Sequence, residues 1–431
     1  MKIRSETWDG SEPDRFATSL RAAAPSPEGL ADAVAETIEQ VRAGGDAAVA
    51  ELGKRFDGVA PERLAVPAER LAAAAAAIPA TLRSAIEATA ANVTAVATAQ
   101  LGEPAELVLD GGQRIEVGEV PVGSAAIYVP GGRAPYPSSV VMGVVPARVA
   151  GVERVVVASP PQRDTGEPAT AVLAAAAITG ADAVFAVGGA QAIAALAHGT
   201  ESIAAVDVIA GPGSPWVQEA KLQCSRRVGI DGYAGPSELV ALVDADVPCE
   251  WIALDLCAQA EHGPGGLLVA IGTDRAWLER LAVAVEAHAG TVPEAVIHLI
   301  AVGTIDEGTA LTQALAPEHV EVIASDPAVA AGLTTAGCVF IGPCSATAFG
   351  DYAAGSNHVL PTGGAGRFTG PLGPGTFRRR ISRVEIDAGA AAALAGTVDV
   401  LARAEGFPLH GESATARAGA GSAQARGNSA S

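Results

Sequence analysis

The chain has 431 residues, of which 49% are hydrophobic and 4% aromatic, so it can form two or more domains whose large cores rely heavily on alanine. Its formal net charge of −20 argues against proteins that bind nucleic acid or anionic membrane surfaces. No run of about 18 uncharged apolar residues predicts a membrane span, and residues 1–6 lack the apolar core of a signal peptide, so we expect a cytoplasmic protein.

Helices are predicted from about residue 27 to residue 104, where alanine is abundant. Gly44-Gly45 separates the first helix from the second, and Pro79 separates the two helices that follow. The expected helical segments are 27–42, 47–52, 69–76 and 82–100.

From Ser124 onward, short apolar runs alternate with helical segments, which predicts parallel sheets covered on both faces. The expected strands are 125–129, 154–158, 183–187, 206–210, 239–243, 267–271, 296–302, 320–324 and 339–341. Helices are expected over 138–150, over 169–179 and after Gly188-Gly189. Residues 355–380 are rich in glycine and proline and predict an ordered loop, followed by a helix over 388–404.

We therefore predict an α/β protein with two Rossmann-like parallel-sheet domains that lack the GxGxxG fingerprint, plus helical N-terminal and C-terminal extensions. The first domain would combine 20–125 with 238–372 and include the helical N-terminal region, and 126–237 would be an inserted α/β domain. Residues 373–413 would form a C-terminal helical tail. Residues 414–431, which have no apolar periodicity, are predicted to be disordered.

Three glycine-rich turns follow expected strands and precede expected helices, at 129–132, 187–191 and 210–214. Helix N-termini at strand ends bind phosphates through free N–H groups. One such turn is weak support, but three in one sheet favour a dinucleotide over packing alone. Because the ordinary fingerprint is missing, spacing alone does not specify NAD.

A candidate half of a metal site lies at the end of an expected helix, where Gln259 and His262 are three residues apart and share one face. Gly263-Pro264 stops this helix. The alternative is a histidine that only caps the helix C-terminus. A thiolate metal site is not expected, because the five cysteines lack CxxC spacing and predict reduced, buried thiols.

Three further polar clusters carry possible chemistry. Glu318-His319 precedes an expected strand and offers two proton-transfer groups, although on this pair alone an ordinary charged strand start is favoured. Asp351 follows a glycine that lets backbone approach a ligand, but it could simply stabilise a turn. Glu405 and His410 end the last expected helix and would matter only if this tail folded across another site.

Taken together, these residues resemble the histidinol dehydrogenase family, whose members are zinc- and NAD-dependent enzymes of the last steps of histidine synthesis. The resemblance runs from about Pro27 to His410. It rests on segments 128–139, 187–200, 210–221, 234–238, 258–264, 316–321, 350–362 and 404–410, which match in order and spacing. It implies oxidation of L-histidinol to L-histidine through L-histidinaldehyde with two NAD⁺. It also implies a homodimer with shared active sites, in which the C-terminal tail reaches the partner subunit and the inserted domain binds NAD.

The family pattern implies a role for each matching residue. The implied zinc ligands are Gln259, His262, Asp351 and, from the partner subunit of the dimer, His410. Glu318 and His319 match the catalytic acid/base pair. The implied substrate contacts are Ser237, Gln259, His262, Glu318, His319, Asp351, Glu405 and His410, and the implied NAD contacts are Tyr128, Gln191 and Ser214.

The chain departs from this pattern at Ser214 and Trp216, where the family usually has Asn and Tyr. A serine hydroxyl offers less hydrogen bonding than a carboxamide, which bears on NAD contact. The loop 368–375 is also unusually rich in glycine and proline. Two alternatives therefore stay open: a related NAD-dependent dehydrogenase of another polar alcohol, or a catalytically inactive protein that binds zinc or a nucleotide.

Overall fold

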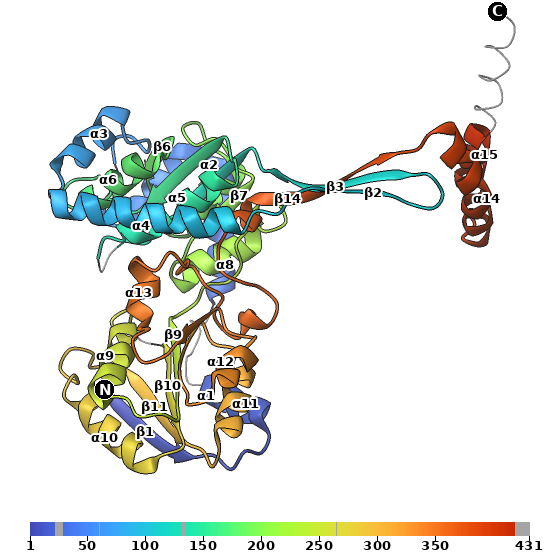
Figure 1. Cartoon of the computed structure of the whole chain (residues 1–431). Coiled ribbons are helices and arrows are strands. Elements are labelled where there is room, and N and C mark those ends of the chain that lie inside the picture. The colour runs from blue at the N-terminus through green and yellow to red at the C-terminus, as the bar shows by residue number, and fades with distance from the viewer. Residues whose placement is uncertain (22–28, 60, 132–133, 264, 419–431) are drawn as a thin grey trace, which may run out of the picture. The chain divides into compact units, whose positions relative to one another are not determined.

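The computed structural model describes residues 1–21, 29–59, 61–131, 134–263 and 265–418 (Figure 1). Contacts divide the chain into two units. Unit 1 comprises 1–100 and 122–377, and unit 2 comprises 101–121 and the part of the chain after residue 377. Each unit is described by itself.

One parallel sheet of unit 1, sheet B, follows the order β6-β5-β4-β7-β8. Its strands are β4 (Ser124–Tyr128), β5 (Arg154–Ser159), β6 (Ala183–Ala186), β7 (Val208–Ala210) and β8 (Gly229–Ile230). The connecting helices are α5 (Pro137–Val149), α6 (Thr170–Thr179), α7 (Gly189–His198) and α8 (Pro215–Cys224). The strand order reverses between β4 and β7, which is the place where doubly wound sheets bind ligands.

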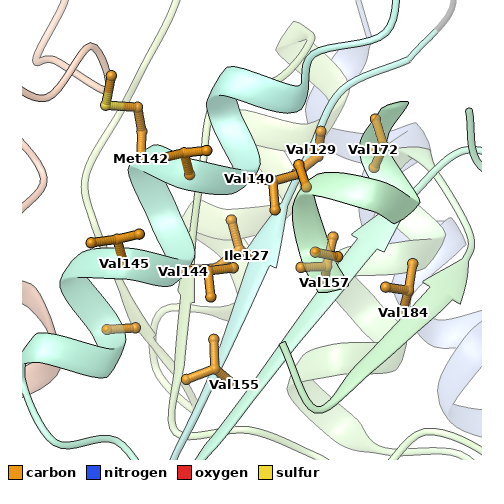
Figure 2. Close-up of a cluster of buried hydrophobic side chains, with 14 of the residues drawn as sticks. Ile127, Val129, Val140, Met142, Val144, Val145, Val155, Val157, Val172 and Val184 are labelled. Atoms are coloured by element: carbon orange, nitrogen blue, oxygen red, sulfur yellow. The ribbon is translucent and has the colours of Figure 1, made fainter. Parts of the chain in front are cut away.

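The core on one face of sheet B is built from small aliphatic side chains. Figure 2 shows Ile127, Val155 and Val157 of the strands against Val140 and other residues of α5, with α6 alongside. Gly143 on α5 allows this close approach, because a Cβ there would lie 2.3 Å from Ile127 Cγ2. Burial on both faces explains why these strands read as continuous apolar runs.

The second parallel sheet of unit 1, sheet A, follows the order β1-β11-β10-β9-β12-β13. Its strands are β1 (Lys2–Thr7), β9 (Glu238–Val243), β10 (Leu267–Gly272), β11 (Val296–Ala301), β12 (His319–Ile323) and β13 (Cys338–Ile341). Its helices are α1 (Pro13–Arg21), α9 (Cys249–Ala260), α10 (Arg275–Glu286), α11 (Ile305–Leu315), α12 (Pro327–Gly332) and α13 (Thr347–Tyr352). From β9 to β13 the order repeats that of sheet B, with β1 added at the edge.

The predicted fold class is confirmed: the protein is α/β with two parallel sheets, and each strand expected between residues 125 and 341 is present. The strand β1 was not expected. It is an edge strand whose side chains are mostly exposed, so its sequence contains charged residues and no apolar run.

The N-terminal helices pack differently from our expectation. They are α2 (Leu30–Phe56), α3 (Ala68–Ala77) and α4 (Ala80–Ala99). Helix α2 contacts α7 and α8, helix α3 contacts α6, and helix α4 contacts α5. All three therefore cover sheet B, whereas we expected them to pack with residues 238–372. Helix α1 and strand β1 do join sheet A. Helical periodicity identifies the face that is buried, but not the surface that receives it.

Two details of these helices refine the prediction. The expected break at Gly44-Gly45 is a kink inside α2, at Gly45 with φ 55° and ψ −139°. Among the described residues, no single helix is long and apolar enough to cross a membrane; α3 and α4 pass that test only as a pair bent by 111°.

Unit 2 contains an antiparallel sheet in the order β14-β3-β2 and a pair of packed helices. Its elements are β2 (Ala105–Val108), β3 (Arg114–Pro121), β14 (Arg378–Glu385), α14 (Ala388–Ala404) and α15 (Pro408–Ala418). The prediction of a purely helical tail over 373–413 is therefore wrong at β14, whose exposed, charged side chains gave no strand signal. Of the predicted disordered tail, 414–418 are helical in α15, and 419–431 lie outside the described residues.

The expected loop at 355–380 is largely irregular. It contains two short 3-10 helices, Ala365–Arg367 and Pro374–Phe377, and passes into β14. Buried Phe377 anchors its end in the core of sheet B.

Candidate active site

A cavity of about 430 Å³ in unit 1 brings together residues far apart in the sequence. Sheet B contributes residues that follow the C-terminal ends of β4 and β7, including Pro130 and Ser214. Sheet A contributes residues at the N-terminal ends of β9 and β12, and α9 and α13 add their C-terminal parts. Of the predicted site residues, those that line the cavity are Ser214, Ser237, Gln259, His262, Glu318, His319 and Asp351.

Helix α9 places Gln259 and His262 at this cavity. The helix runs opposite to the parallel strands, so its C-terminal end falls at the edge where β9 and β12 begin. Gln259 is buried in the last turn, and His262 follows the helix and stays exposed. Gly263, with φ 128°, ends the helical path in a conformation that favours glycine. Burial by the surrounding walls lowers the pKa of His262, against the attraction of the Asp351 charge.

Helix α13 supplies Asp351, and a glycine allows this helix to sit close to sheet A. A Cβ at Gly350 would lie 2.4 Å from Phe340 Cζ, so α13 packs directly on the Phe340 ring. Asp351 Oδ2 accepts a hydrogen bond from Gln259 Nε2 at 3.3 Å, and its Oδ1 lies 3.6 Å from His319 Nε2. The carboxylate is therefore shared between α9 and β12.

Glu318 and His319 are held at the start of β12 by Glu238 at the start of β9. The backbone N–H of Glu238 donates to Glu318 Oε2 at 2.8 Å, and the backbone N–H of Glu318 donates to Glu238 Oε2 at 3.2 Å. His319 Nδ1 donates to the backbone oxygen of Glu238 at 3.1 Å, because a carbonyl can only accept. Its Nε2 is thereby left as the nitrogen that can exchange a proton.

Both groups have raised pKa values. Burial raises the pKa of Glu318 to about 7, in spite of the nearby His319. Burial alone would lower the pKa of His319, but the charge of Glu318 and the hydrogen bond and charge of Asp351 raise it to about 9. Near neutral pH the pair can therefore both hold and release protons, which is the property that a general acid/base pair needs.

The donor set around Gln259 fits a divalent cation. Gln259 Oε1 is buried and has no hydrogen-bond partner among the residues that the structure describes, although the Gln259 side chain lies beside the Asp351 carboxylate. An amide oxygen, a carboxylate and the nearby imidazole of His262 are ligands that zinc accepts. Among the described residues, no group of three or more His, Cys, Asp and Glu forms a metal site. Of the expected zinc ligands in unit 1, only His262 and Asp351 are of these four residue types, because the third ligand, Gln259, is a glutamine.

His358 adds a second imidazole that sequence reasoning did not select. Its Nδ1 donates to the backbone oxygen of Asp351 at 2.7 Å, and its Nε2 lies 3.3 Å from Ser139 Oγ. Burial lowers its pKa, so the neutral form is favoured. His358 thus holds the C-terminal end of α13. In the sequence, the only indication of this role is that His358 follows Asp351 by seven residues.

Two predicted residues are not brought to the cavity in this chain. Glu405 caps the C-terminal end of α14, and His410 lies in α15, so both belong to unit 2. Both side chains are exposed, and the His410 ring contacts Phe407 with centroids 5.6 Å apart.

Two predicted NAD contacts, Tyr128 and Gln191, are buried beneath the turns of sheet B. The Tyr128 hydroxyl accepts from the backbone N–H of Gly189 at 3.1 Å, and burial raises its pKa to about 12. Gln191 Nε2 lies 3.3 Å from Asp57 Oδ2. Both side chains bond within the protein and are not among those that line the cavity. Ser214, by contrast, lines the cavity at the start of α8.

A buried ion pair that sequence reasoning missed fixes the turn before Ser214. Lys221 pairs with Asp231, and both side chains are almost fully buried. Lys221 Nζ donates to the backbone oxygen of Gly211 at 3.0 Å, and Asp231 Oδ2 accepts from the Gly211 N–H at 2.7 Å. A Cβ at Gly211 would lie 2.1 Å from the backbone oxygen of Tyr128, so only glycine fits this clamp.

Comparison with known proteins identifies the relatives of this chain. The family model for histidinol dehydrogenase matches residues 21–418. The histidinol dehydrogenase of Ruegeria pomeroyi is 41% identical over 424 residues, which cover 95% of this chain and 98% of the relative. That of Pseudomonas aeruginosa is 41% identical over 409 residues, covering 91% and 92%.

A solved structure agrees with these sequences. The crystal structure of histidinol dehydrogenase from Elizabethkingia anophelis is 28% identical, covers 97% of this chain and 98% of its own, and has a TM-score of 0.90. Sequence and fold thus match over nearly the full length, and the chain belongs to the histidinol dehydrogenase family of oxidoreductases.

Proposed function

We propose that this protein oxidises L-histidinol to L-histidine through L-histidinaldehyde, with zinc bound and with two NAD⁺ as hydride acceptors. The observation that carries the proposal is the pairing, in one cavity, of Glu318 and His319 with an unsatisfied Gln259 oxygen beside Asp351. The first group suits proton transfer, and the second suits a cation. The full-length similarity to histidinol dehydrogenases supports the same reaction.

Zinc would be held by Gln259, His262 and Asp351, with the partner subunit's His410 completing the set in a homodimer. When bound, zinc would supply a Lewis acid with affinity for the nitrogen atoms of an amino alcohol that carries an imidazole. The protein's contribution is the placement of these donors: Asp351 is held by Gln259 on one side and lies near His319 on the other.

The first oxidation requires a base for the alcohol proton. His319 Nε2 would accept this proton while the hydride leaves the carbinol carbon for NAD⁺, giving the aldehyde and NADH. Its Nδ1–H stays fixed on the Glu238 carbonyl, so the ring keeps one tautomer and one orientation. The reaction needs His319 in its neutral form.

The second oxidation requires water. Ionised Glu318 would take a proton from a water molecule as the water oxygen attacks the aldehyde carbon. Protonated His319 would give its proton to the former carbonyl oxygen, which yields the hydrated aldehyde and leaves His319 neutral. His319 would then accept a hydroxyl proton while a second hydride leaves for the second NAD⁺, giving the carboxylic acid. Glu318 and His319 are neighbours that line the same cavity, with Glu318 Oε2 3.5 Å from His319 Nδ1.

Further residues are proposed to bind the reactants. Ser237 would contact the substrate together with Glu405 of the C-terminal tail, and Tyr128, Gln191 and Ser214 would serve NAD at the sheet B side. For the two buried residues, we propose that they shape the NAD-binding turns. The proposal also includes the cytoplasm as the location and no nucleic-acid or membrane partner.

The direct test measures NADH absorbance with L-histidinol, before and after treatment with a chelator and after re-addition of zinc. We expect two NADH per L-histidinol consumed, loss of activity on chelation and recovery with zinc. Absence of NADH formation by the zinc-loaded protein would overturn the proposal.

The shared site has a separate test. The variants His410→Ala and His262→Ala are each expected to be inactive as homodimers. A heterodimer of the two would contain one intact set of donors and should regain about half the activity per dimer that two intact sites give. Verified heterodimers without recovery would contradict a site built from two subunits.

Another polar alcohol is the second candidate substrate, which the departures at Ser214, Trp216 and the loop 368–375 leave open. Ser214 stands where the resemblance implies a carboxamide, and Trp216 beside it is exposed. A panel of polar alcohols tested with NAD⁺ decides between them: the substrate with the highest kcat/KM identifies the activity. Zinc binding without NADH formation from any alcohol would instead support an inactive binding protein.

A further inference from the structure

Three polar residues, of which Glu321 and Thr347 are buried and Asp255 is half-buried, form a layer directly beneath the candidate site. Asp255 lies on α9 four residues before Gln259, and Thr347 lies on α13 four residues before Asp351. Glu321 lies on β12 two residues after His319. Residues four apart on a helix, or two apart on a strand, share a face. The lower layer therefore repeats the upper one on the same three elements.

The burial pattern of β12 shows which face this is. Val320 and Val322 pack in the core with Leu311 of α11 and other residues on that side. Ile323 packs on the opposite side, in the core that contains Ile252 and Leu256 of α9. Alternation along the strand thus places His319 and Glu321 on the face covered by α9.

Contacts within the lower layer are short. Glu321 Oε1 accepts from Thr347 Oγ1 at 2.5 Å and from the Thr347 backbone N–H at 2.8 Å. Both residues are almost fully buried. This link joins β12 to the first turn of α13.

The carboxyl group of Glu321 also interacts with α9. Its Oε2 is buried with no donor among the described residues, and the side chains of Glu321 and Asp255 interact with each other. Two ionised carboxylates would repel each other, so a proton between them satisfies the orphan oxygen. Burial first, and then the charge of Glu321, raise the pKa of Asp255 to about 7, which agrees with a shared proton.

Contacts in the upper layer are longer. Gln259 and Asp351 are 3.3 Å apart, and Asp351 and His319 are 3.6 Å apart. Such contacts locate their own side chains weakly. The short Glu321–Thr347 contacts below are in the right place to set the spacing of β12 and α13, and the Asp255–Glu321 pair is in the right place to set that of α9.

We propose that Asp255, Glu321 and Thr347 are positioning residues that fix α9, β12 and α13 relative to one another and so hold Gln259, Asp351 and His319 at the spacing that a bound metal ion and substrate need. This inference rests on the proposed function, because it concerns the same site. Residues beneath metal ligands commonly tune metal affinity through such contacts.

The test compares Glu321→Ala with Glu321→Gln. Alanine removes both links, whereas the glutamine oxygen can still accept from Thr347 and its amide can donate to Asp255. Zinc transfer from the loaded protein to a chromophoric chelator gives the affinity, and NADH formation gives kcat and KM. We expect Glu321→Ala to bind zinc about 10- to 100-fold more weakly and to lose kcat, while Glu321→Gln stays near wild type.

A second pair covers the case in which Glu321→Ala does not fold. Thr347→Val keeps the shape and the backbone link but removes the hydroxyl, and Thr347→Ser keeps the hydroxyl. The expected order of zinc affinity is wild type and Thr347→Ser together, with Thr347→Val below them.

Val285→Ala is the matched control for lost stability. Val285 is fully buried on α10, in the apolar cluster that also contains residues of α9, and its side chain can make no hydrogen bond to the three polar residues. It should lower the melting temperature and leave zinc affinity unchanged.

The outcomes separate the two proposals. If the alanine and valine variants keep wild-type zinc affinity and kcat, or if Val285→Ala loses as much zinc at an equal loss of melting temperature, the positioning role is wrong. If the wild type binds zinc but forms no NADH from L-histidinol, the proposed function is wrong. The zinc affinities of the variants still test whether Asp255, Glu321 and Thr347 position the metal ligands. A wild type that binds no zinc overturns both.

Discussion

The two sheets of unit 1 share one strand order but present opposite edges to the cavity. Sheet B offers the C-terminal ends of β4 and β7, with glycine-rich turns and the N-terminal end of α8. Sheet A offers the N-terminal ends of β9 and β12, with the C-terminal end of α9. Because helix N-termini carry partial positive charge and C-termini partial negative charge, the same topology gives two electrostatically different walls.

This difference assigns a task to each wall. Among the described residues that line the cavity, those of the sheet B wall include backbone N–H groups and no charged side chain, which suits the phosphates of a dinucleotide. The sheet A wall has Glu318, His319 and Asp351, which suit proton transfer and a cation. Variants on each wall should therefore change different measured quantities.

His319→Asn is expected to have the largest effect. It removes the proton acceptor on the sheet A wall, so kcat should fall by about 10²- to 10⁴-fold. Zinc content, measured by atomic absorption, should stay near wild type, because His319 is not among the proposed ligands. Loss of zinc in this variant would show that His319 is a metal ligand, and would contradict the separation of proton transfer from metal binding within the sheet A wall.

Lys221→Met tests the sheet B wall. It leaves Asp231 buried without its partner, which should cost about 3–5 kcal/mol of unfolding free energy in denaturant titrations. Because Lys221 and Asp231 hold Gly211, the KM for NAD⁺ should rise in the folded fraction while zinc affinity is kept. The double variant Lys221→Met with Asp231→Leu removes both charges and should recover part of the stability. Equal loss of zinc and NAD⁺ binding would show that the two walls are not independent.

The pH dependence of kcat/KM sharpens the role of the sheet A pair. Glu318 must be ionised and His319 neutral, so kcat/KM should rise about a hundredfold per pH unit below the lower pKa of about 7, about tenfold per pH unit between about 7 and about 9, and level off above about 9. The charge of Glu318 is the main cause that raises the pKa of His319. In Glu318→Gln, the part of the pH profile that reports the pKa of His319 should therefore move to lower pH, when the rate of the first oxidation is measured. A profile that does not move would contradict this coupling.

Ser214→Asn should have the smallest effect. An added carboxamide offers one more donor at the start of α8, and a hydrogen bond contributes about 0.5–1.5 kcal/mol. The KM for NAD⁺ should thus fall by up to about tenfold, with kcat nearly unchanged. Ser214→Ala is the matched control, because it changes the same side chain without adding an amide. A KM that rises in both variants would show that the serine hydroxyl itself serves the cofactor.

Buried strands could be predicted from the sequence and exposed ones could not. Strands such as β5 and β9 have both faces covered, so they appear as apolar runs. Strands β1 and β14 pair along exposed surfaces with charged side chains and leave no such run. Likewise, the buried faces of α2 to α4 could be read, but their partners on sheet B depend on contacts between distant segments.

The site shows the same limit. Glu318, His319 and Asp351 were selected from motifs and the family resemblance, but their convergence depends on strand order, which no local pattern contains. In the sequence, Asp255 and Lys221 cannot be told from ordinary charged residues on the exposed faces of helices. Glu321 carried the one readable signal, a carboxylate inside an otherwise apolar strand. Such a residue is rarely buried without a partner.

Glu238 has a consequence for how this protein can evolve. Its carboxylate accepts from Arg21, from Glu318 N–H and from Gly363 N–H, and its backbone engages both Glu318 and His319. A shorter or neutral side chain would disturb several bonds at once, and no single second-site change could restore them all. Substitutions of Glu238 are therefore expected to be selected against. Homologues with an altered substrate range should differ at neighbouring residues while keeping a glutamate at this position.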